Sequence, residues 1–170
     1  PWFVYIISMI YEDVKIGFYM YTHPLGGRGT NKWKYYYETI LLTLIRLCSF
    51  SNITHCHIQI GNNSMVALMG MDATFASIET VNSFLGEPDI LIDIGNLEID
   101  VEGIDKIISG LFRGTPHEII CWFLFTRWFG VKKPKTCATL ICEILQLCGH
   151  QIKTCVSPAE LYREVRQCNS

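Results

Sequence analysis

Residues 136–145 read Thr-Cys-Ala-Thr-Leu-Ile-Cys-Glu-Ile-Leu. The apolar residues after Cys137 are typical of a buried helix, and Cys137 falls in its first turn. First-turn N–H groups have no partner inside the helix, and the helix dipole places partial positive charge there. A thiol at such a position ionises more easily than a free cysteine, whose pKa is about 8.5. The pattern therefore marks Cys137 as a candidate nucleophile.

Most other cysteines are expected to be packing residues, because cysteine is among the residue types most often buried. Cys142 follows Cys137 by five positions. At ~100° and ~1.5 Å per residue, it lies about 140° around the helix and about 7.5 Å along it. We interpret Cys142 and Cys148 as core residues. The chain has eight cysteines, at positions 48, 56, 121, 137, 142, 148, 155 and 168.

A second informative stretch, residues 54–61, reads Thr-His-Cys-His-Ile-Gln-Ile-Gly. Side chains alternate between the two faces of a strand, so His55, His57 and Gln59 share one face. Cys56, Ile58 and Ile60 share the other face. An imidazole within hydrogen-bond reach of Cys137 would complete a cysteine–histidine pair, and either histidine could be the base.

Length and composition limit the class of protein. A chain of 170 residues fits one domain with a sizeable core, which we expect to span residues 1–170. The net charge of −2 and the scattered basic residues argue against nucleic acid as a partner. No run reaches the ~18 to 20 apolar residues that cross a bilayer, so no transmembrane segment is expected. The apolar residues 2–11 are typical of a core strand rather than a signal peptide.

The cysteine count does not require disulfides, because disulfide frameworks belong mainly to short secreted chains. A reducing, intracellular setting follows as the expectation. A metal site built from the histidines and cysteines is an alternative. However, four, five and six residues separate Cys137, Cys142, Cys148 and Cys155 in turn, so only the first pair has the Cys-x2–4-Cys spacing common in zinc sites, and no second such pair completes a motif. We expect neither a metal nor a cofactor.

Periodicity and turn residues predict the remaining elements. Two strands or a hairpin should flank Glu12 and Asp13, a glycine-rich loop should follow, and an amphipathic helix should pack on the sheet. Ser157-Pro-Ala-Glu160 is a capping box with proline at the first helical position. The predicted strands are 2–11, 14–22, 53–61, 65–70, 89–94, 118–126 and 150–155, the helices are 32–50, 74–85, 101–112, 137 onward and 158–167, and the loops include 23–31 and 132–135.

The residues His55-Cys-His-Ile-Gln-Ile-Gly61 and Thr136-Cys-Ala-Thr-Leu-Ile-Cys-Glu-Ile-Leu145 resemble two motifs of one superfamily. These are the histidine strand and the cysteine helix of the circularly permuted NlpC-type papain-like hydrolases. That superfamily includes bacterial, phage and poxvirus members and the lecithin–retinol acyltransferase group. Val156-Ser-Pro-Ala-Glu-Leu-Tyr162 is similar to a segment that often follows the cysteine helix. The resemblance covers residues 52–165, and the first fifty residues have no clear counterpart.

The resemblance implies an α+β fold in which an antiparallel sheet packs against helices and the histidine strand precedes the cysteine helix. It also implies Cys137 as the nucleophile and His55, in preference to His57, as the base. A third polar group would orient the imidazole. His57 is one candidate for that group, and the others are Gln59, Asp72 and Glu118.

The implied chemistry is acyl transfer on a peptide, amide or acyl-ester substrate through a thioester. Nothing in the motifs selects among these substrates. The resemblance to a superfamily with phage and poxvirus members adds a viral particle to the expected locations. The competing hypothesis is a non-catalytic domain that keeps the fold and binds protein partners in a larger assembly.

Overall fold

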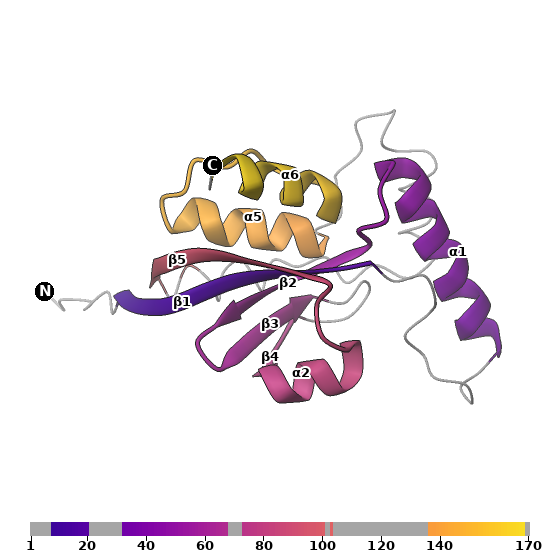
Figure 1. The fold of residues 1–170 in the computed structure, drawn as a ribbon, viewed down its shortest axis with the longest axis horizontal. Helices are drawn as coiled ribbons and strands as arrows, with labels where there is room; N and C mark the ends of the chain where they lie inside the picture. The colour runs from indigo at the N-terminus through magenta and orange to yellow at the C-terminus, as the bar shows by residue number, and fades with distance from the viewer. Residues whose placement is uncertain (1–7, 21–31, 68–72, 101–102, 104–135, 169–170) are drawn as a thin grey trace, which may run out of the picture.

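The computed structural model describes residues 8–20, 32–67, 73–100, 103 and 136–168. Within these residues, strands form one five-stranded sheet in the order β4-β3-β2-β1-β5, and all neighbouring strands are antiparallel (Figure 1). The strands are β1 (Ser8–Tyr19), β2 (His55–Ile60), β3 (Asn63–Ala67), β4 (Ala73–Ser77) and β5 (Ile90–Asp100). The helices are α1 (Lys32–Ser49), α2 (Ile78–Leu85), α5 (Cys137–Leu147) and α6 (Pro158–Cys168).

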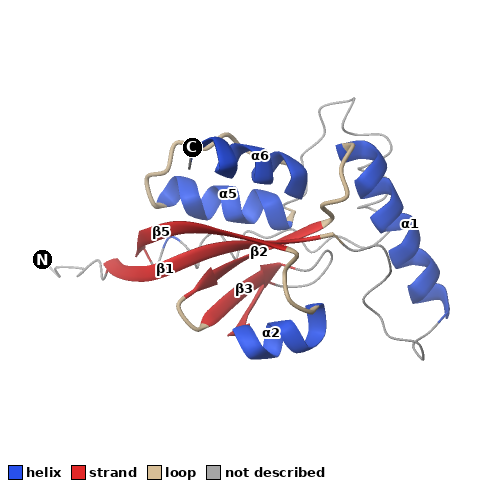
Figure 2. Ribbon diagram, viewed as in Figure 1, coloured by secondary structure: helices blue, strands red, loops and turns tan. Residues whose placement is uncertain are grey.

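The described helices take different places around the sheet. Helices α5 and α6 cover one face, α2 lies on the opposite side beside β3 and β4, and α1 stands at one end (Figure 2). The expected α+β class, with an antiparallel sheet against helices, is therefore confirmed. That residues 1–170 form a single domain stays a prediction.

The main core fills the space between the sheet and the two C-terminal helices. Alternate residues of β1 and β2 point into it, and the apolar side of α5 packs onto them. This confirms the predicted alternation along β2, because Cys56, Ile58 and Ile60 all belong to this core. The other members with almost no exposed surface include Val14, Ile16, Phe18, Leu97, Ala138, Leu140, Ile141, Cys142, Ile144 and Leu161.

The opposite face carries a smaller cluster made by Tyr19 of β1 with Val81 and Leu85 of α2. His57 contacts Tyr19 and is fully buried on this face. The two faces of β2 thus have different chemistry, one apolar and one built around imidazoles.

The predicted hairpin at Glu12 and Asp13 is wrong. β1 runs through these residues as one strand and pairs with β5 on both sides of them. The pairing register shifts between Tyr11 and Val14, and Asp13 has a positive φ of 55° and an exposed side chain. The charged pair therefore marks a bulge, which accommodates polar residues without reversing the chain.

Helix α1 forms over Lys32–Ser49 as predicted. Within the described part of the chain, α1 makes no extensive contact with a strand, so its predicted packing on the sheet is not seen there. The helix stands to one side of the sheet (Figure 1). Its apolar side chains at Tyr36, Ile40 and Leu47 are exposed, whereas Ile45 is buried. Helical periodicity shows that an apolar stripe exists but not what covers it.

Two other element boundaries differ from the prediction because of specific hydrogen bonds. The expected helix 74–85 begins only at Ile78, because Ser77 caps it by accepting from the Thr80 N–H at 3.2 Å, and β4 precedes it. The expected strand 89–94 continues to Asp100 because β1 pairs with it along that length.

The expected strand 150–155 does not form, because its polar groups bind α5 side chains instead of a neighbouring strand. Gln146 Nε2 donates to the carbonyl of Ile152 at 2.8 Å. Thr139 Oγ1 donates to the carbonyl of Cys155 at 3.1 Å, and the Cys155 N–H donates to Cys142 Sγ at 3.3 Å. The segment is therefore held against the helix that precedes it.

The capping box before α6 is confirmed. The Glu160 N–H donates to Ser157 Oγ at 3.3 Å, and Glu160 Oε2 accepts from the N–H groups of Val156 and Ser157. β2 and β3 pair through a tight turn, in which Gly61 has a φ of 56°. The predictions for 2–7, 21–31, 68–70, 101–102, 104–112, 118–126 and 132–135 lie outside the described residues.

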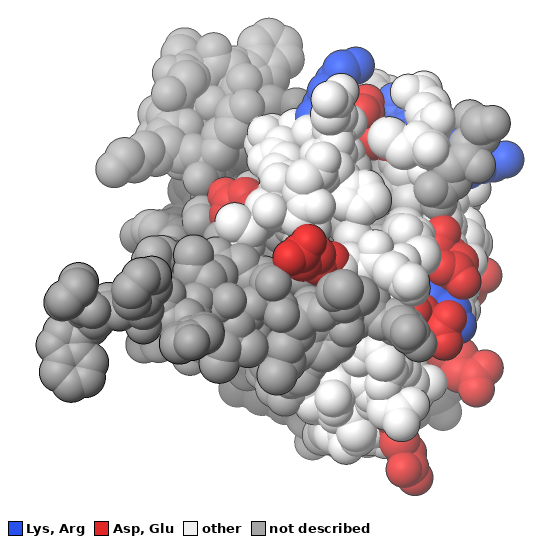
Figure 3. All heavy atoms as spheres, turned by 90° about the vertical axis from the view of Figure 1, so that its left-hand side faces the viewer, with Lys and Arg blue, Asp and Glu red and all other residues white. Residues whose placement is uncertain are grey.

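Charged side chains of both signs lie scattered over the face shown in Figure 3, among larger uncharged areas. No helix in the described ranges combines the length and apolarity needed to cross a bilayer.

Candidate active site

Cys137 is the first residue of α5, and Thr136 is its N-cap with an extended backbone. The Thr136 hydroxyl accepts from the Thr139 N–H at 3.2 Å and donates to the carbonyl of Val156 at 3.0 Å. The first intrahelical bond runs from the Leu140 N–H to the Thr136 carbonyl at 2.9 Å. The amides of Cys137 and Ala138 precede that bond, in the turn where a helix offers no acceptor of its own. The predicted position of Cys137 is therefore confirmed.

The surroundings of the Cys137 sulfur favour its ionised form. The Cys56 thiol forms a hydrogen bond to it that lowers the pKa of Cys137, while burial acts in the opposite direction. The charge of His55, a hydrogen bond with that imidazole and the Cys56 backbone lower the pKa further. The result is a pKa well below the ordinary value for cysteine, although only 6% of the residue is exposed.

His55 is the first residue of β2 and lies opposite Tyr19 in the pairing of β1 with β2. The rings of His55 and Tyr19 have centroids 5.8 Å apart and are tilted by 37°. His55 is buried, with 9% of its surface exposed. Of the two predicted histidines, His55 is the one whose charge acts on Cys137.

His57 is engaged at both ring nitrogens. Its Nδ1 lies 2.8 Å from Tyr19 Oη, and its Nε2 lies 3.0 Å from Gln59 Nε2. Because the Gln59 amide nitrogen can only donate, neutral His57 carries its proton on Nδ1 and donates it to Tyr19. Burial and then the charge of His55 lower the pKa of His57 from 6.5 to about 4. His57 is therefore neutral at neutral pH.

The lack of a side chain at Gly17 leaves the space that the imidazole of His57 occupies. Gly17 lies opposite His57 in the β1–β2 pairing, on the same face of the sheet. A Cβ at residue 17 would overlap His57 Nε2 and come within 2.8 Å of its Cδ2 and 3.0 Å of Pro88 Cβ. A side chain at residue 17 and the imidazole of His57 cannot both occupy this space without movement.

Cys56 and Tyr19 also belong to this site, and neither was predicted as part of it. The alternation along 54–61 places Cys56 on the apolar face of the strand. That face is the one that α5 covers, so Cys56 lies beneath the helix that carries Cys137. That combination is a usable signal, because a cysteine on the strand face beneath a cysteine helix is a candidate contact. Tyr19 lies 38 residues before His57, and nothing local in the sequence connects them.

The other predicted residues fall into three groups. Cys142 is fully buried and hydrogen-bonded by the Cys155 N–H, as expected for a packing residue. Gln59 binds His57, while Asp72 and Glu118 lie outside the described residues. Among the residues that are described, no group of three or more His, Cys, Asp or Glu side chains could hold a metal ion.

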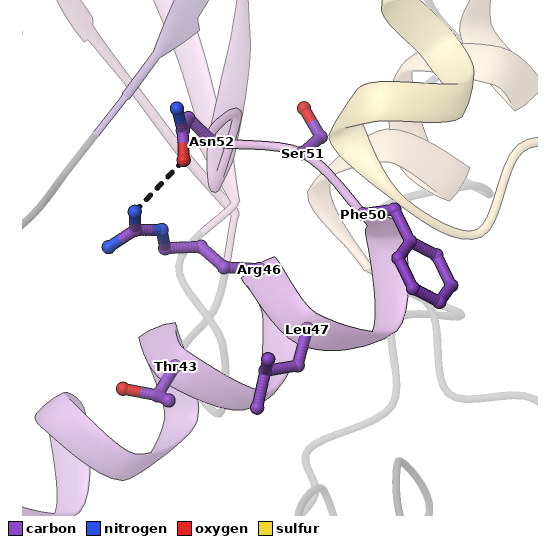
Figure 4. A pocket seen from close by; sticks show the side chains of 6 residues that line it. All are labelled: Thr43, Arg46, Leu47, Phe50, Ser51 and Asn52. Carbon is purple, nitrogen blue, oxygen red and sulfur yellow. Dashed lines mark hydrogen bonds between the residues drawn. The ribbon is translucent and has the colours of Figure 1, made fainter.

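A surface hollow of about 510 Å³ lies at the C-terminal end of α1 (Figure 4). Arg46 donates to Asn52 Oδ1 at 2.9 Å along its wall, and Phe50 is 97% exposed at its rim. None of Cys137, His55 and His57 lines this hollow. The remaining lining residues are Thr43, Leu47 and Ser51.

No protein-family model matches the chain, and neither curated proteins nor solved structures gave a match.

Proposed function

We propose that the protein is a thiol hydrolase or acyltransferase that cleaves an amide, peptide or ester bond through a thioester on Cys137. In this proposal His55 is the base, and the chain order of β2 before α5 agrees with the permuted papain-like arrangement that the motifs resemble. One observation carries the proposal: the Cys137 sulfur, at the first residue of α5, has its pKa held down by Cys56 and His55 together.

The reaction begins with attack of the Cys137 thiolate on a carbonyl carbon. First-turn amides of α5, including that of Cys137, are suited to stabilise the oxyanion that forms. Protonated His55 then gives its proton to the leaving group, and the acyl group stays on sulfur. Water or another acceptor releases the acyl group and regenerates the thiolate.

The neutral state of His57 supports this assignment of roles. A second positive charge beside His55 would disfavour the imidazolium that accompanies a thiolate. With its pKa at about 4, His57 carries no such charge at neutral pH. Its bonds to Tyr19 and Gln59 instead hold the polar face of β2 in place.

Iodoacetamide alkylation between about pH 5 and pH 9, with the modified cysteines mapped by mass spectrometry, tests the proposal. We expect Cys137 to react fastest of the cysteines and to keep reacting well below pH 8. His55→Ala should slow this reaction at low pH, whereas His150→Ala, at an exposed histidine, should not. Uniformly slow alkylation of Cys137, or alkylation indifferent to His55→Ala, contradicts the proposal.

A partner-binding domain without catalysis is the second candidate, and the surface of α1 favours it. Tyr36, Ile40 and Leu47 of α1, and Phe50 directly after it, are all more than half exposed, at 61%, 52%, 64% and 97%. Exposed apolar side chains in such a row mark interaction sites. A folded protein whose Cys137 is inert to alkylation at every pH would favour this function over the first.

A further inference from the structure

The segment that joins α5 to α6 is held by side chains of both helices, at the end of α5 where Cys137 lies. Thr136 Oγ1, at the N-cap of α5, donates to the carbonyl of Val156 at 3.0 Å. The N–H of the same Val156 donates to Glu160 Oε2, in the first turn of α6, at 2.8 Å. The two helices lie side by side on one face of the sheet (Figure 2). A single residue, Val156, therefore connects the start of one helix to the start of the other.

Neighbouring hydrogen bonds fix the position of Val156. The carbonyl of Cys155 accepts from Thr139 Oγ1 at 3.1 Å, and the N–H of Ser157 donates to Glu160 Oε2 at 3.4 Å. Cys155 and Ser157 are both buried. Hydrogen bonds in a sheltered place are electrostatically stronger than bonds in water. The hydroxyl that caps α5 therefore meets its acceptor at a defined place.

We infer that Glu160 is a positioning residue for the nucleophile Cys137. Its carboxylate holds Val156, whose carbonyl accepts from Thr136 Oγ1. That hydroxyl in turn accepts from the Thr139 N–H at 3.2 Å and closes the first turn of α5. Glu160 thus acts through the start of the helix and not on the reacting atoms. The inference rests on the proposed function, because it assigns Glu160 a part in keeping Cys137 reactive.

The Val156 carbonyl matters because a hydroxyl has one proton and two lone pairs. While Val156 accepts the proton of Thr136 Oγ1, the lone pairs of that oxygen face the Thr139 N–H. An N-cap bond of this kind keeps the first turn closed. The N–H groups and the positive dipole end of a closed first turn favour a thiolate there, and fraying weakens both effects. Loss of the Glu160 carboxylate should therefore make Cys137 less reactive at low pH.

The two halves of the capping box allow a matched comparison. Ser157 Oγ accepts from the Glu160 N–H at 3.3 Å, and this bond caps α6. The Glu160 carboxylate instead extends back to Val156, the residue that binds the N-cap of α5. Ser157→Ala and Glu160→Ala should both weaken the start of α6, but only Glu160→Ala should reach α5.

The test is iodoacetamide alkylation of Cys137 in the full chain between about pH 5 and pH 9. In Glu160→Ala, alkylation at about pH 6 should slow by roughly three- to tenfold, the size of a helix-terminus effect on a charge. The rates should converge near pH 9, because an ordinary thiol with a pKa of about 8.5 is largely ionised there. Glu160→Gln keeps an acceptor oxygen and should stay within about twofold of the unchanged protein, and so should Ser157→Ala.

This pH profile separates positioning from a loss of stability. Local unfolding would expose the buried Cys137 and speed its alkylation at every pH, which is the opposite of the expected change. Hydrogen exchange gives a second measurement, because the Thr139 amide should exchange faster in Glu160→Ala than in Ser157→Ala. Thr136→Val should shift the profile as Glu160→Ala does, and the double variant should shift it no further, since both changes break one chain of bonds.

Three outcomes count against the inference. Equal profiles for Glu160→Ala and the unchanged protein overturn it and leave the reactive Cys137 of the proposed function in place. Equal slowing by Ser157→Ala, or additive effects of Thr136→Val and Glu160→Ala, also overturns it without touching the proposed function. If Cys137 of the unchanged protein does not react at low pH, the proposed function fails, and the inference fails with it.

Discussion

The phenolic oxygen of Tyr19 lies 2.8 Å from Nδ1 of His57, and both residues are fully buried. This contact connects β1 to the imidazole face of β2, and the Tyr19 ring packs against both histidines, tilted toward His55 and edge-on to His57. Burial, followed by the charge of Asp89, raises the pKa of Tyr19, so the phenol stays protonated. Tyr19 therefore holds His57 by a hydrogen bond and packs against His55, on the same face of the sheet.

Tyr19→Phe should lower the stability of the fold but leave the reactivity of the Cys137 thiol unchanged. The variant removes the bond to His57 Nδ1 but keeps the ring that packs against His55. A buried polar atom left without its partner costs about 1–3 kcal/mol, so the free energy of unfolding should fall by that amount. Urea denaturation measures the loss. Cys137 alkylation should stay within about twofold of the original rate, whereas Tyr19→Ala should reduce both properties.

The folded protein should lose stability in acid because of His57. Its pKa falls from 6.5 to about 4 on folding, so between these values the unfolded chain binds a proton that the folded chain does not. The free energy of unfolding should therefore decrease as the pH falls from about 6.5 to about 4, by roughly 3 kcal/mol at most.

His57→Gln provides the comparison for that prediction, because an amide can bond in the same place without titrating. Urea denaturation of both proteins at a series of pH values isolates the contribution of His57, since the carboxyl groups are common to both. Parallel pH profiles for the two proteins would show that His57 does not titrate as described.

Gly17→Ala should destabilise the protein through its contact with His57. The new Cβ would lie 2.8 Å from His57 Cδ2 and 3.0 Å from Pro88 Cβ, which are strained distances. Overpacking of this kind costs about 1–3 kcal/mol. A double-mutant cycle with His57→Ala checks the cause, because removing the imidazole should recover part of the loss. An equal cost of Gly17→Ala in both backgrounds would exclude His57 as its source.

Thr136→Val should weaken the start of α5. The change removes the hydroxyl that accepts from the Thr139 N–H and donates to the Val156 carbonyl. Loss of an N-cap costs about 0.5–2 kcal/mol, and alkylation of Cys137 should slow because the first turn holds its sulfur. Thr136→Ser keeps the hydroxyl and should behave like the unchanged protein. Calorimetry and alkylation kinetics of the two variants give the comparison.

Local patterns predicted the elements that position the candidate site. The capping box Ser157–Glu160 predicted the start of α6, and the apolar run after Thr136 predicted α5. These predictions succeeded because capping and helical periodicity depend on residues within a few positions of one another. The prediction of a hairpin at Asp13 failed because a bulge and a turn use the same polar residues, and only pairing with β5 distinguishes them.

The sequence by itself determined that Cys137 begins a helix and that His55 and His57 share a strand face, since both follow from backbone geometry. Only the tertiary structure decided which imidazole acts on the Cys137 sulfur, that Cys56 contacts the same sulfur, and that Tyr19 and Gln59 hold His57 neutral. The reason is physical: charge, burial and hydrogen bonding depend on distances between elements, and the register of β1 against β2 and the packing of α5 set those distances.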